Sequence, residues 1–337
     1  MMKRILLTGG SGTVGREVLG QLCELPERHE ITVFDMKSRS TVSFFRKFGN
    51  RIKTVYGNIS VREEVSKVCD NKDLVIHLAA IIPPLADKEP LLAEAVNVRG
   101  TFNLAECTRE QSPDAFFLYS SSISVYGDRC WNPWINVTDS LVPSDRDEYA
   151  RTKIKAEEVV RKSGLKFSIF RLTAIMGINN HKPSALMFHM PLTSKLEIAT
   201  PADTGRAFAN AVNKLDILNG KIYNLSGGET CRISYADFIE RSFRIFGLGK
   251  ADFREKSFAE RNFHCGFYED GDILNEILDF RRDSIDDYFI MVQKGISPVK
   301  KILTVLFRRM IKYNLQKKSE PFAAAESGNK EDISHYF

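Results

Sequence analysis

The amino-acid sequence predicts an α/β fold, in which a doubly wound parallel sheet carries a smaller C-terminal lobe. Between residues 3 and 172, short apolar runs alternate with longer segments of helical spacing. The runs are apolar at nearly every position, which is typical of strands that helices cover on both faces. A glycine-rich turn lies between the first run and the first helical segment. Strand, glycine turn and helix in this order begin many doubly wound sheets.

The elements are assigned in chain order from the spacing of apolar residues. Continuous apolar runs indicate buried strands, and apolar residues three and four apart indicate helices. The predicted strands are 3–8, 30–34, 52–56, 73–79, 115–120, 166–172 and 221–225, and the predicted helices are 14–25, 61–68, 93–110, 147–162, 203–215, 235–246 and 272–278. The pattern loosens after Gly177, so residues 178–200 are expected to form a loop.

The charge distribution argues against a nucleic-acid-binding body. The chain of 337 residues has a formal charge of +5, but residues 288–319 hold eight Lys and Arg and no Asp or Glu. The other residues hold 40 basic and 43 acidic side chains. No basic surface for nucleic acid is therefore expected outside this one segment.

Cysteine usage and hydropathy indicate the compartment. The six cysteines include no C-x-x-C pair, so neither a metal site nor a disulfide framework is expected. Reduced cysteines are typical of the cytoplasm. The chain start reaches glycine too soon for a signal peptide, and no run of 18 apolar residues could span a membrane. We expect a cytoplasmic protein.

The glycine turn is a candidate phosphate-binding loop. Gly9, Gly12 and Gly15 leave room for the backbone to approach a pyrophosphate, and Thr13 and Val14 open the helix that follows. The N–H groups of a helix N-terminus and its partial positive charge favour phosphate there. We therefore expect this turn to bind a dinucleotide cofactor.

Asp35 indicates which dinucleotide is bound. It lies 20 residues after Gly15, at the end of the second predicted strand. A carboxylate at this place bonds the ribose hydroxyls and repels a 2′-phosphate, which favours NAD. Lys37 and Arg39 follow closely and would suit a 2′-phosphate, so NADP is not excluded.

Tyr149 and Lys153 are candidate catalytic residues. They are four residues apart on a predicted helix, so they share one face. An ammonium near a phenol favours the phenolate, so we expect Lys153 to lower the pKa of Tyr149. Ser122 belongs to a serine cluster at the carboxyl end of a strand, where its hydroxyl is expected to bond a substrate oxygen. An isolated Y-x-x-x-K pair is usually just solvated, but here it follows the glycine turn and the serines in order.

In combination, these motifs resemble the extended short-chain dehydrogenase/reductase family, in its NAD-dependent epimerase/dehydratase group, over about residues 3–290. The segments that carry the resemblance are Thr8 to Gly15, His77 to Ala80, Val96 to Thr101, Ser120 to Gly127, Tyr149 to Lys153, Arg171-Leu172 and Ile222 to Gly228. The resemblance implies an enzyme that transfers hydride through a Tyr-Lys-Ser site.

The resemblance also assigns supporting roles to residues around this site. It implies that Ser122, Tyr149 and Lys153 are catalytic, that Lys153 also holds the cofactor ribose, and that Asn97 supports the active site. It implies a cofactor wall for the adenine and ribose side, made of Leu78, Ala79 and Ala80. Asn58 and Ile59 stand where the family usually has Asp-Ile or Asp-Leu beside the adenine.

Several departures from the family pattern bear on the substrate. Ile123 and Ser124 stand where nucleotide-sugar 4,6-dehydratases carry Asp-Glu, so that dehydration is not expected. Residues 196–203 lack the arginine that often binds nucleotide phosphates, and the segment from 177 to 203 is shorter than in the epimerases.

The resemblance leaves several functions open. The first is an oxidoreductase or epimerase acting on a secondary alcohol or ketone of a sugar or nucleotide sugar. The second is a reductase or dehydrogenase of a lipid-like or other small hydroxy or keto compound. A non-catalytic NAD(P)-binding regulatory protein is the third, although such proteins typically lose the tyrosine or the lysine.

The domain prediction follows from these motifs. Residues 1–177 are expected to form the NAD(P)-binding Rossmann domain, to which 200–226 returns. Residues 178–199 and 227–315 are expected to form the substrate lobe. Residues 316–337 are polar and aperiodic, which is typical of a disordered tail.

The segment 299–315 is a predicted basic amphipathic helix. Two interpretations stay open for it: packing on its own domain or a second subunit, and contact with an anionic membrane surface.

Family resemblance also implies a homodimer through the helices 93–110 and 147–162. His77 lies within an apolar strand and is expected to be a buried, hydrogen-bonded histidine rather than a metal ligand.

Overall fold

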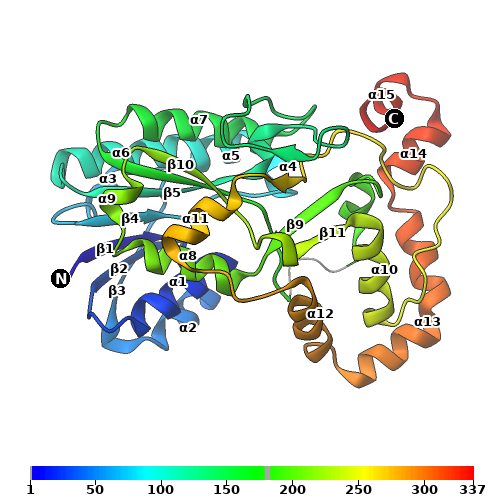
Figure 1. The fold of residues 1–337 in the computed structure, drawn as a ribbon, viewed down its shortest axis with the longest axis horizontal. Coiled ribbons are helices and arrows are strands. Elements are labelled where there is room, and N and C mark those ends of the chain that lie inside the picture. The colour runs from blue at the N-terminus through cyan, green and yellow to red at the C-terminus, as the bar shows by residue number, and fades with distance from the viewer. Residues whose placement is uncertain (1, 179–182) are drawn as a thin grey trace.

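A seven-stranded parallel sheet forms the centre of the molecule, which confirms the predicted fold class (Figure 1). The computed structural model describes residues 2–178 and 183–337. The strand order is β10-β7-β5-β4-β1-β2-β3. The strands are β1 (Arg4–Thr8), β2 (Glu30–Asp35), β3 (Ile52–Tyr56), β4 (Leu74–His77), β5 (Phe116–Ser122), β7 (Lys166–Leu172) and β10 (Lys221–Leu225). The order reverses between β1 and β4, and such a switch point is where doubly wound sheets bind ligands.

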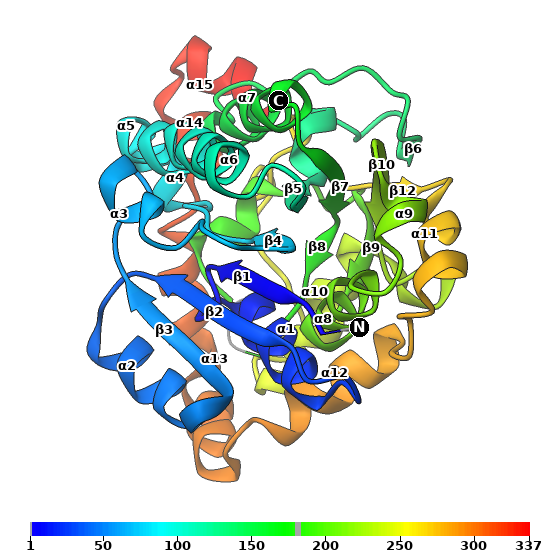
Figure 2. The same ribbon diagram turned by 90° about the vertical axis from the view of Figure 1, so that its left-hand side faces the viewer.

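Helices cover both faces of this sheet (Figure 2). On one face lie α1 (Thr13–Glu24) and α8 (Pro201–Ala211), and on the other lie α3 (Arg62–Ser66), α6 (Gly100–Gln111) and α7 (Glu148–Lys162). Successive strand residues point to opposite faces. In β1, Ile5 and Leu7 therefore pack with α1 and α8, while Leu6 packs with α6 and α7.

Shorter elements connect this framework. They are α2 (Arg39–Arg46), α4 (Leu85–Lys88), α5 (Pro90–Ala93), α9 (Leu215–Leu218) and α11 (Gly271–Leu278), the 3-10 turns Gly49–Arg51, Ile123–Tyr126 and Glu229–Cys231, and the two-stranded sheet of β6 (Trp134–Ile135) and β12 (Phe267–Tyr268). The single helix predicted over 93–110 is instead α5, a π-helical turn (Glu94–Arg99) and α6. The π-turn contains Asn97.

A second lobe packs around a small three-stranded sheet. It contains β8 (Ala174–Ile175), β9 (Lys195–Ala199) and β11 (Arg232–Ser234), with α10 (Tyr235–Phe246) and α12 (Ile285–Lys294). The predicted loop over 178–200 is therefore wrong in part, because it contains β9 and a 3-10 turn at Ala185–His189. Leu196 and Ile198 alternate with polar neighbours and are both buried in the lobe core.

The C-terminal segment forms helices rather than a disordered tail. They are α13 (Pro298–Gln316), α14 (Glu320–Ser327) and α15 (Lys330–Tyr336). The Ser319 hydroxyl accepts a hydrogen bond from the Phe322 N–H and so caps α14, as the Asn329 side chain caps α15. Ala324 and Tyr336 are buried against Ala259 of the lobe. These long-range contacts order a stretch whose own composition is polar.

Candidate active site

The glycine loop between β1 and α1 has the close backbone packing that requires glycine. Gly9 has φ +73°, and a Cβ there would lie 2.6 Å from the backbone nitrogen of Ala79. A Cβ at Gly15 would lie 2.1 Å from the carbonyl oxygen of Gly9. At Gly12 the nearest such contact is 3.4 Å, and this N-cap residue has no side chain to bond the first N–H groups of α1. The loop therefore leaves helix N–H groups for an anion.

The Asp35 carboxylate lies beside this loop. Its two oxygens accept hydrogen bonds from the Ser11 N–H at 2.8 Å and from the Met36 N–H at 2.8 Å. These bonds hold the carboxylate at the end of β2, next to the turn. The position suits the ribose hydroxyls of NAD, so the donors and acceptors present fit this cofactor.

A cleft of about 640 Å³ joins the glycine loop to the candidate catalytic residues. The predicted site residues that line it are Gly9, Gly12, Thr13, Val14, Gly15, Leu78, Ala80, Ser122, Tyr149 and Lys153. The other predicted site residues, Asp35, Asn58, Ile59, Ala79 and Asn97, are not among the residues that line the cleft. Ile59 is buried, and a Cβ at Gly100 would lie 2.6 Å from its side chain. Contact of Asn58, Ile59 and Ala79 with an adenine stays a prediction.

Lys153 and Ser122 flank the phenol of Tyr149. The Lys153 ammonium donates to the carbonyl oxygen of Ser120 at 2.8 Å and to the Tyr119 hydroxyl at 3.2 Å. It lies 5.8 Å from the centre of the Tyr149 ring. The Ser122 hydroxyl oxygen accepts from the backbone N–H of Ser124 at 3.2 Å, and its bond with the phenol favours the ionised form of Tyr149.

The acidity of the tyrosine differs from the prediction. Burial raises the pKa of Tyr149 above its usual range, and the Ser122 hydrogen bond opposes this only in part. Burial also lowers the pKa of Lys153 to about 7, against the attraction of the Glu157 carboxylate. The expected lowering of the Tyr149 pKa is absent because the ammonium bonds β5 instead of the phenol, while burial disfavours the phenolate.

Asn97 supports the site from behind. Its side-chain oxygen accepts from the Ile81 N–H at 2.8 Å, and its amide donates to the Ile81 carbonyl oxygen and to the Thr152 hydroxyl, both at 2.9 Å. Thr152 in turn donates to the carbonyl oxygen of Tyr149 at 2.8 Å. Asn97 thus ties the segment after β4 to α7, from a π-turn of the kind often found at functional sites.

Glu157 and Tyr119 lie behind the cleft and act on Lys153, and neither was predicted. Glu157 bonds the guanidinium of Arg171 through both oxygens, at 2.9 and 2.8 Å, and accepts from the Ser121 hydroxyl at 2.5 Å. Both charged side chains are almost fully buried. Glu157 follows Lys153 by four residues, so continuing the Tyr149–Lys153 spacing along the helix would have found it. No comparable sequence signal marks Tyr119.

His77 is buried and hydrogen-bonded, as expected. Its Nδ1 lies 2.7 Å from the Thr8 hydroxyl and its Nε2 lies 2.9 Å from the Thr101 hydroxyl. Burial, with the nearby Lys153 charge, lowers the pKa of His77 to about 3. Within residues 2–178 and 183–337, no group of three or more His, Cys, Asp or Glu is placed to hold a metal ion.

Beyond Tyr149 the wall of the cleft is mostly apolar. The apolar side chains come from the second lobe: Met176, Leu186, Met187, Met190, Tyr235, Phe238, Ile239, Phe243 and Phe263. Polar side chains gather where α15 reaches the cleft. There His335 lies 2.7 Å from Asp145, and Arg146 bonds Asp332 at 2.9 Å and Glu331 at 3.0 Å.

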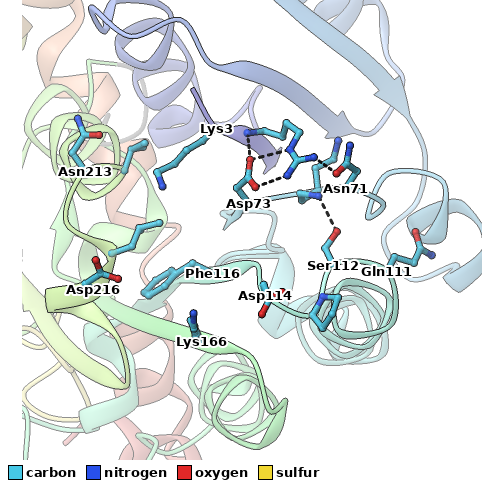
Figure 3. A pocket seen from close by; sticks show the side chains of 15 residues that line it. Lys3, Asn71, Asp73, Gln111, Ser112, Asp114, Phe116, Lys166, Asn213 and Asp216 are labelled. Atoms are coloured by element: carbon cyan, nitrogen blue, oxygen red, sulfur yellow. Dashed lines mark hydrogen bonds and ion pairs between the residues drawn. The ribbon is translucent and has the colours of Figure 1, made fainter. Parts of the chain in front are cut away.

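A second hollow, of about 620 Å³, lies at the opposite edge of the sheet (Figure 3). It is lined mainly by polar side chains. Asp73 pairs there with the guanidinium of Arg4, and the Ser112 hydroxyl accepts from the Lys72 N–H at 2.8 Å. It is at the amino ends of β1, β4 and β5, away from the edge where parallel sheets bind ligands. The cleft beside the glycine loop is therefore the candidate active site.

Comparison with known proteins gives the family. Residues 5–196 match the model of the NAD dependent epimerase/dehydratase family. UDP-glucose 4-epimerase of Neisseria meningitidis serogroup C is 29% identical over 205 residues, which cover 56% of this chain and 57% of that protein. 3 beta-hydroxysteroid dehydrogenase type 7 of Mus musculus is 28% identical over 123 residues, 36% of this chain and 33% of that protein. The matches span about a third to just over half of the length of these two relatives.

Solved structures share the fold at low identity. UDP-glucose-4-epimerase of Stenotrophomonas maltophila, with bound NAD and formylated UDP-arabinopyranose, has a TM-score of 0.71 and 18% identity, and the match covers 90% of this chain and 99% of that chain. The dTDP-glucose 4,6-dehydratase DesIV of Streptomyces venezuelae has a TM-score of 0.70 and 20% identity, with coverage of 86% and 96%. The chain belongs to the NAD dependent epimerase/dehydratase family.

Proposed function

We propose that the protein transfers hydride between NAD and a secondary alcohol or its ketone, with Tyr149, Lys153 and Ser122 as its reacting residues. The observation that carries the proposal is that one cleft brings these groups together. It is lined by the glycine loop between β1 and α1, by Ser122 from β5, and by Tyr149 and Lys153 from α7. NAD, when bound, supplies the acceptor or donor of the hydride. An epimerase would return hydride to the other face of the same substrate.

The roles of the side chains follow from their protonation. Burial keeps the Tyr149 phenol protonated near neutral pH because it raises the pKa. The phenol is therefore suited to donate its proton to a ketone oxygen, which leaves a phenolate; in the reverse direction that phenolate takes the proton of the alcohol. Ser122 bonds the same substrate oxygen. When protonated, Lys153 has three donors, of which two serve Ser120 and Tyr119, so one remains for the cofactor ribose.

Two substrate classes are candidates. A sugar or nucleotide sugar is supported by the relative whose name gives UDP-glucose as its substrate. A lipid-like or other small hydroxy or keto compound is supported by the hydroxysteroid dehydrogenase relative and by the apolar wall of the cleft. A diphosphate requires cations or N–H donors. Two arginines are among the described lining residues: Arg146 pairs with Glu331 and Asp332, and Arg261 is exposed. Because the wall of the cleft beyond Tyr149 is mostly apolar, we favour the lipid-like class.

The test is Tyr149→Phe, assayed by NADH absorbance over a panel of nucleotide sugars and lipid-like ketones. We expect turnover to fall by about 10²-fold or more, while NAD affinity stays within about twofold because the ring and its packing remain. Tyr313→Phe, on an exposed tyrosine of α13, is the control and is expected to behave as wild type. Unchanged turnover in Tyr149→Phe would contradict the mechanism.

We also propose a cytoplasmic homodimer and contact of residues 299–315 with a membrane surface. The six cysteines are free thiols in the structure, which supports a reducing compartment.

The dimer proposal is supported by the exposed side chain of Phe102. It is 49% exposed on α6, one of the two helices expected to form the dimer. Among the described residues, no helix combines the length and hydropathy needed to cross a bilayer.

A further inference from the structure

Helix α13 turns an apolar stripe toward solvent. Its 19 residues include no buried side chain. The stripe consists of Val299, Ile302, Leu303, Leu306, Met310 and Tyr313, which are between 50% and 71% exposed. These residues recur at spacings of three and four, so they lie on one side of the helix. Six large apolar side chains in one exposed row are typical of an interaction surface.

The opposite side of α13 is the one that packs on the protein. Ile311 and Leu315 contact the core of the second lobe. Lys312 pairs with Asp252, and the Gln316 amide donates to the Ser257 hydroxyl at 2.7 Å. The helix runs along the outer edge of the lobe, beside α10 (Figure 1). Packing on its own domain therefore does not cover the stripe, which leaves it available to a partner.

The charges around the stripe favour an anionic occupant. Residues 288–319 carry eight Lys and Arg and no Asp or Glu. Within the described ranges, only Lys312 of these eight takes part in an ion pair, with Asp252. On the helical wheel, Lys300 and Arg309 lie on the two flanks of the stripe. Two copies of α13 packed stripe to stripe would bring these cations together, which like-charge repulsion opposes.

We propose that α13 lies flat on an anionic lipid bilayer, with the stripe inserted among the headgroups and Lys300 and Arg309 against lipid phosphates. This inference gives the chemistry of the membrane contact proposed above and does not depend on hydride transfer. Insertion removes the apolar side chains from water, and the flanking cations gain attraction to the anionic surface. No helix of the described residues is long and apolar enough to cross a bilayer, and the contact that we propose is peripheral.

The experiment is co-sedimentation of the full chain with vesicles of phosphatidylcholine alone and of phosphatidylcholine mixed with phosphatidylserine. We expect the wild type to bind the mixed vesicles, and high salt to weaken this binding. The double variant Leu306→Ser/Met310→Ser is expected to lose at least about tenfold in partitioning, because two large apolar side chains leave the stripe. Ile217→Ser, at a 49% exposed residue of α9, is the matched control.

Two further measurements separate the outcomes. Turnover on a soluble substrate is expected to be the same in all variants, so a failure of the proposed oxidoreductase activity would be visible separately from a failure of membrane binding. Sedimentation velocity measures the oligomeric state. Equal vesicle binding by the wild type and the stripe variant would overturn the proposal. It would also be overturned if the wild type bound no vesicles and the stripe substitutions changed a dimer to a monomer, because the stripe would then be a dimer interface.

Discussion

The cofactor side and the C-terminal side of the cleft are held in different ways. Around the glycine loop and α7, backbone contacts and buried charges fix the residues, as at Gly15 and at the Glu157–Arg171 pair. At α15, Tyr336 is buried, but the side of the helix that faces Arg146 is held by exposed ion pairs through Glu331 and Asp332. Buried contacts of the first kind tolerate little change, whereas exposed ion pairs contribute little stability each. The two sides should therefore respond to substitution by very different amounts.

The largest effect is expected at Lys153, the buried ammonium of the cofactor side. Burial lowers its pKa to about 7, while an unfolded chain protonates lysine up to about pH 10.4. Between these values the unfolded state binds more protons, so this residue makes the protein more stable as the pH rises from about 7 to about 10. At about 1.4 kcal/mol per pKa unit, the change amounts to several kcal/mol.

Lys153→Met removes this dependence. Compared with wild type, the variant should gain relative stability at pH 6 and lose that advantage by about pH 10, as measured by the midpoint of thermal unfolding across the range. Lys155→Met, at an exposed lysine of the same helix, should follow the wild-type profile. If the pH profiles of the unfolding midpoint were parallel for Lys153→Met and wild type, burial would not lower the pKa of the Lys153 side chain.

The second effect in size is expected at Gly15. Its added methyl in Gly15→Ala would lie 2.1 Å from the Gly9 carbonyl oxygen, so the loop must move. We expect a loss of about 1–3 kcal/mol in the free energy of unfolding and at least about tenfold weaker NAD binding, read by denaturant titration and by calorimetry.

Gly20 in the same helix supplies the control. A Cβ there meets no atom within 4 Å beyond its chain neighbours and its own helix backbone. Gly20→Ala should leave NAD affinity unchanged and stabilise the protein by about 0.5–1 kcal/mol, because alanine favours the helix. If both variants bound NAD equally well, the close packing of the loop would not be what requires glycine.

The same contrast explains what the sequence could predict. The strands of the parallel sheet, the glycine loop and the Tyr149–Lys153 pair depend on local spacing and on short motifs, which are visible along the chain. The raised pKa of Tyr149 was missed because it depends on burial and on where the Lys153 ammonium points. Neither quantity can be seen in a spacing of four residues.

The C-terminal helices were missed for a related reason. Residues 316–337 have few apolar side chains, and composition alone indicates disorder. The structure orders them through partners far along the chain, such as Asp145 for His335 and Ser257 for Ser319. Contacts between residues that are some 60 to 190 positions apart leave no local signal. β9 was missed because the charged side chains of Lys195 and Glu197 interrupt its apolar residues, whereas the strands were assigned mainly from continuous apolar runs.

The smallest effect is expected where α15 closes the cleft. Glu331→Gln/Asp332→Asn removes the two partners that α15 supplies to Arg146, and exposed pairs of this kind contribute little. Because His335 and Tyr336 of α15 line the cleft, loosening the helix should raise KM for the substrate by about two- to fivefold, with kcat and NAD affinity unchanged. Glu158→Gln, which breaks the exposed pair with Lys162 on α7, should alter none of these constants. An equal rise in the KM for NAD would mean that α15 acts on the whole cleft and that the two sides are not independent.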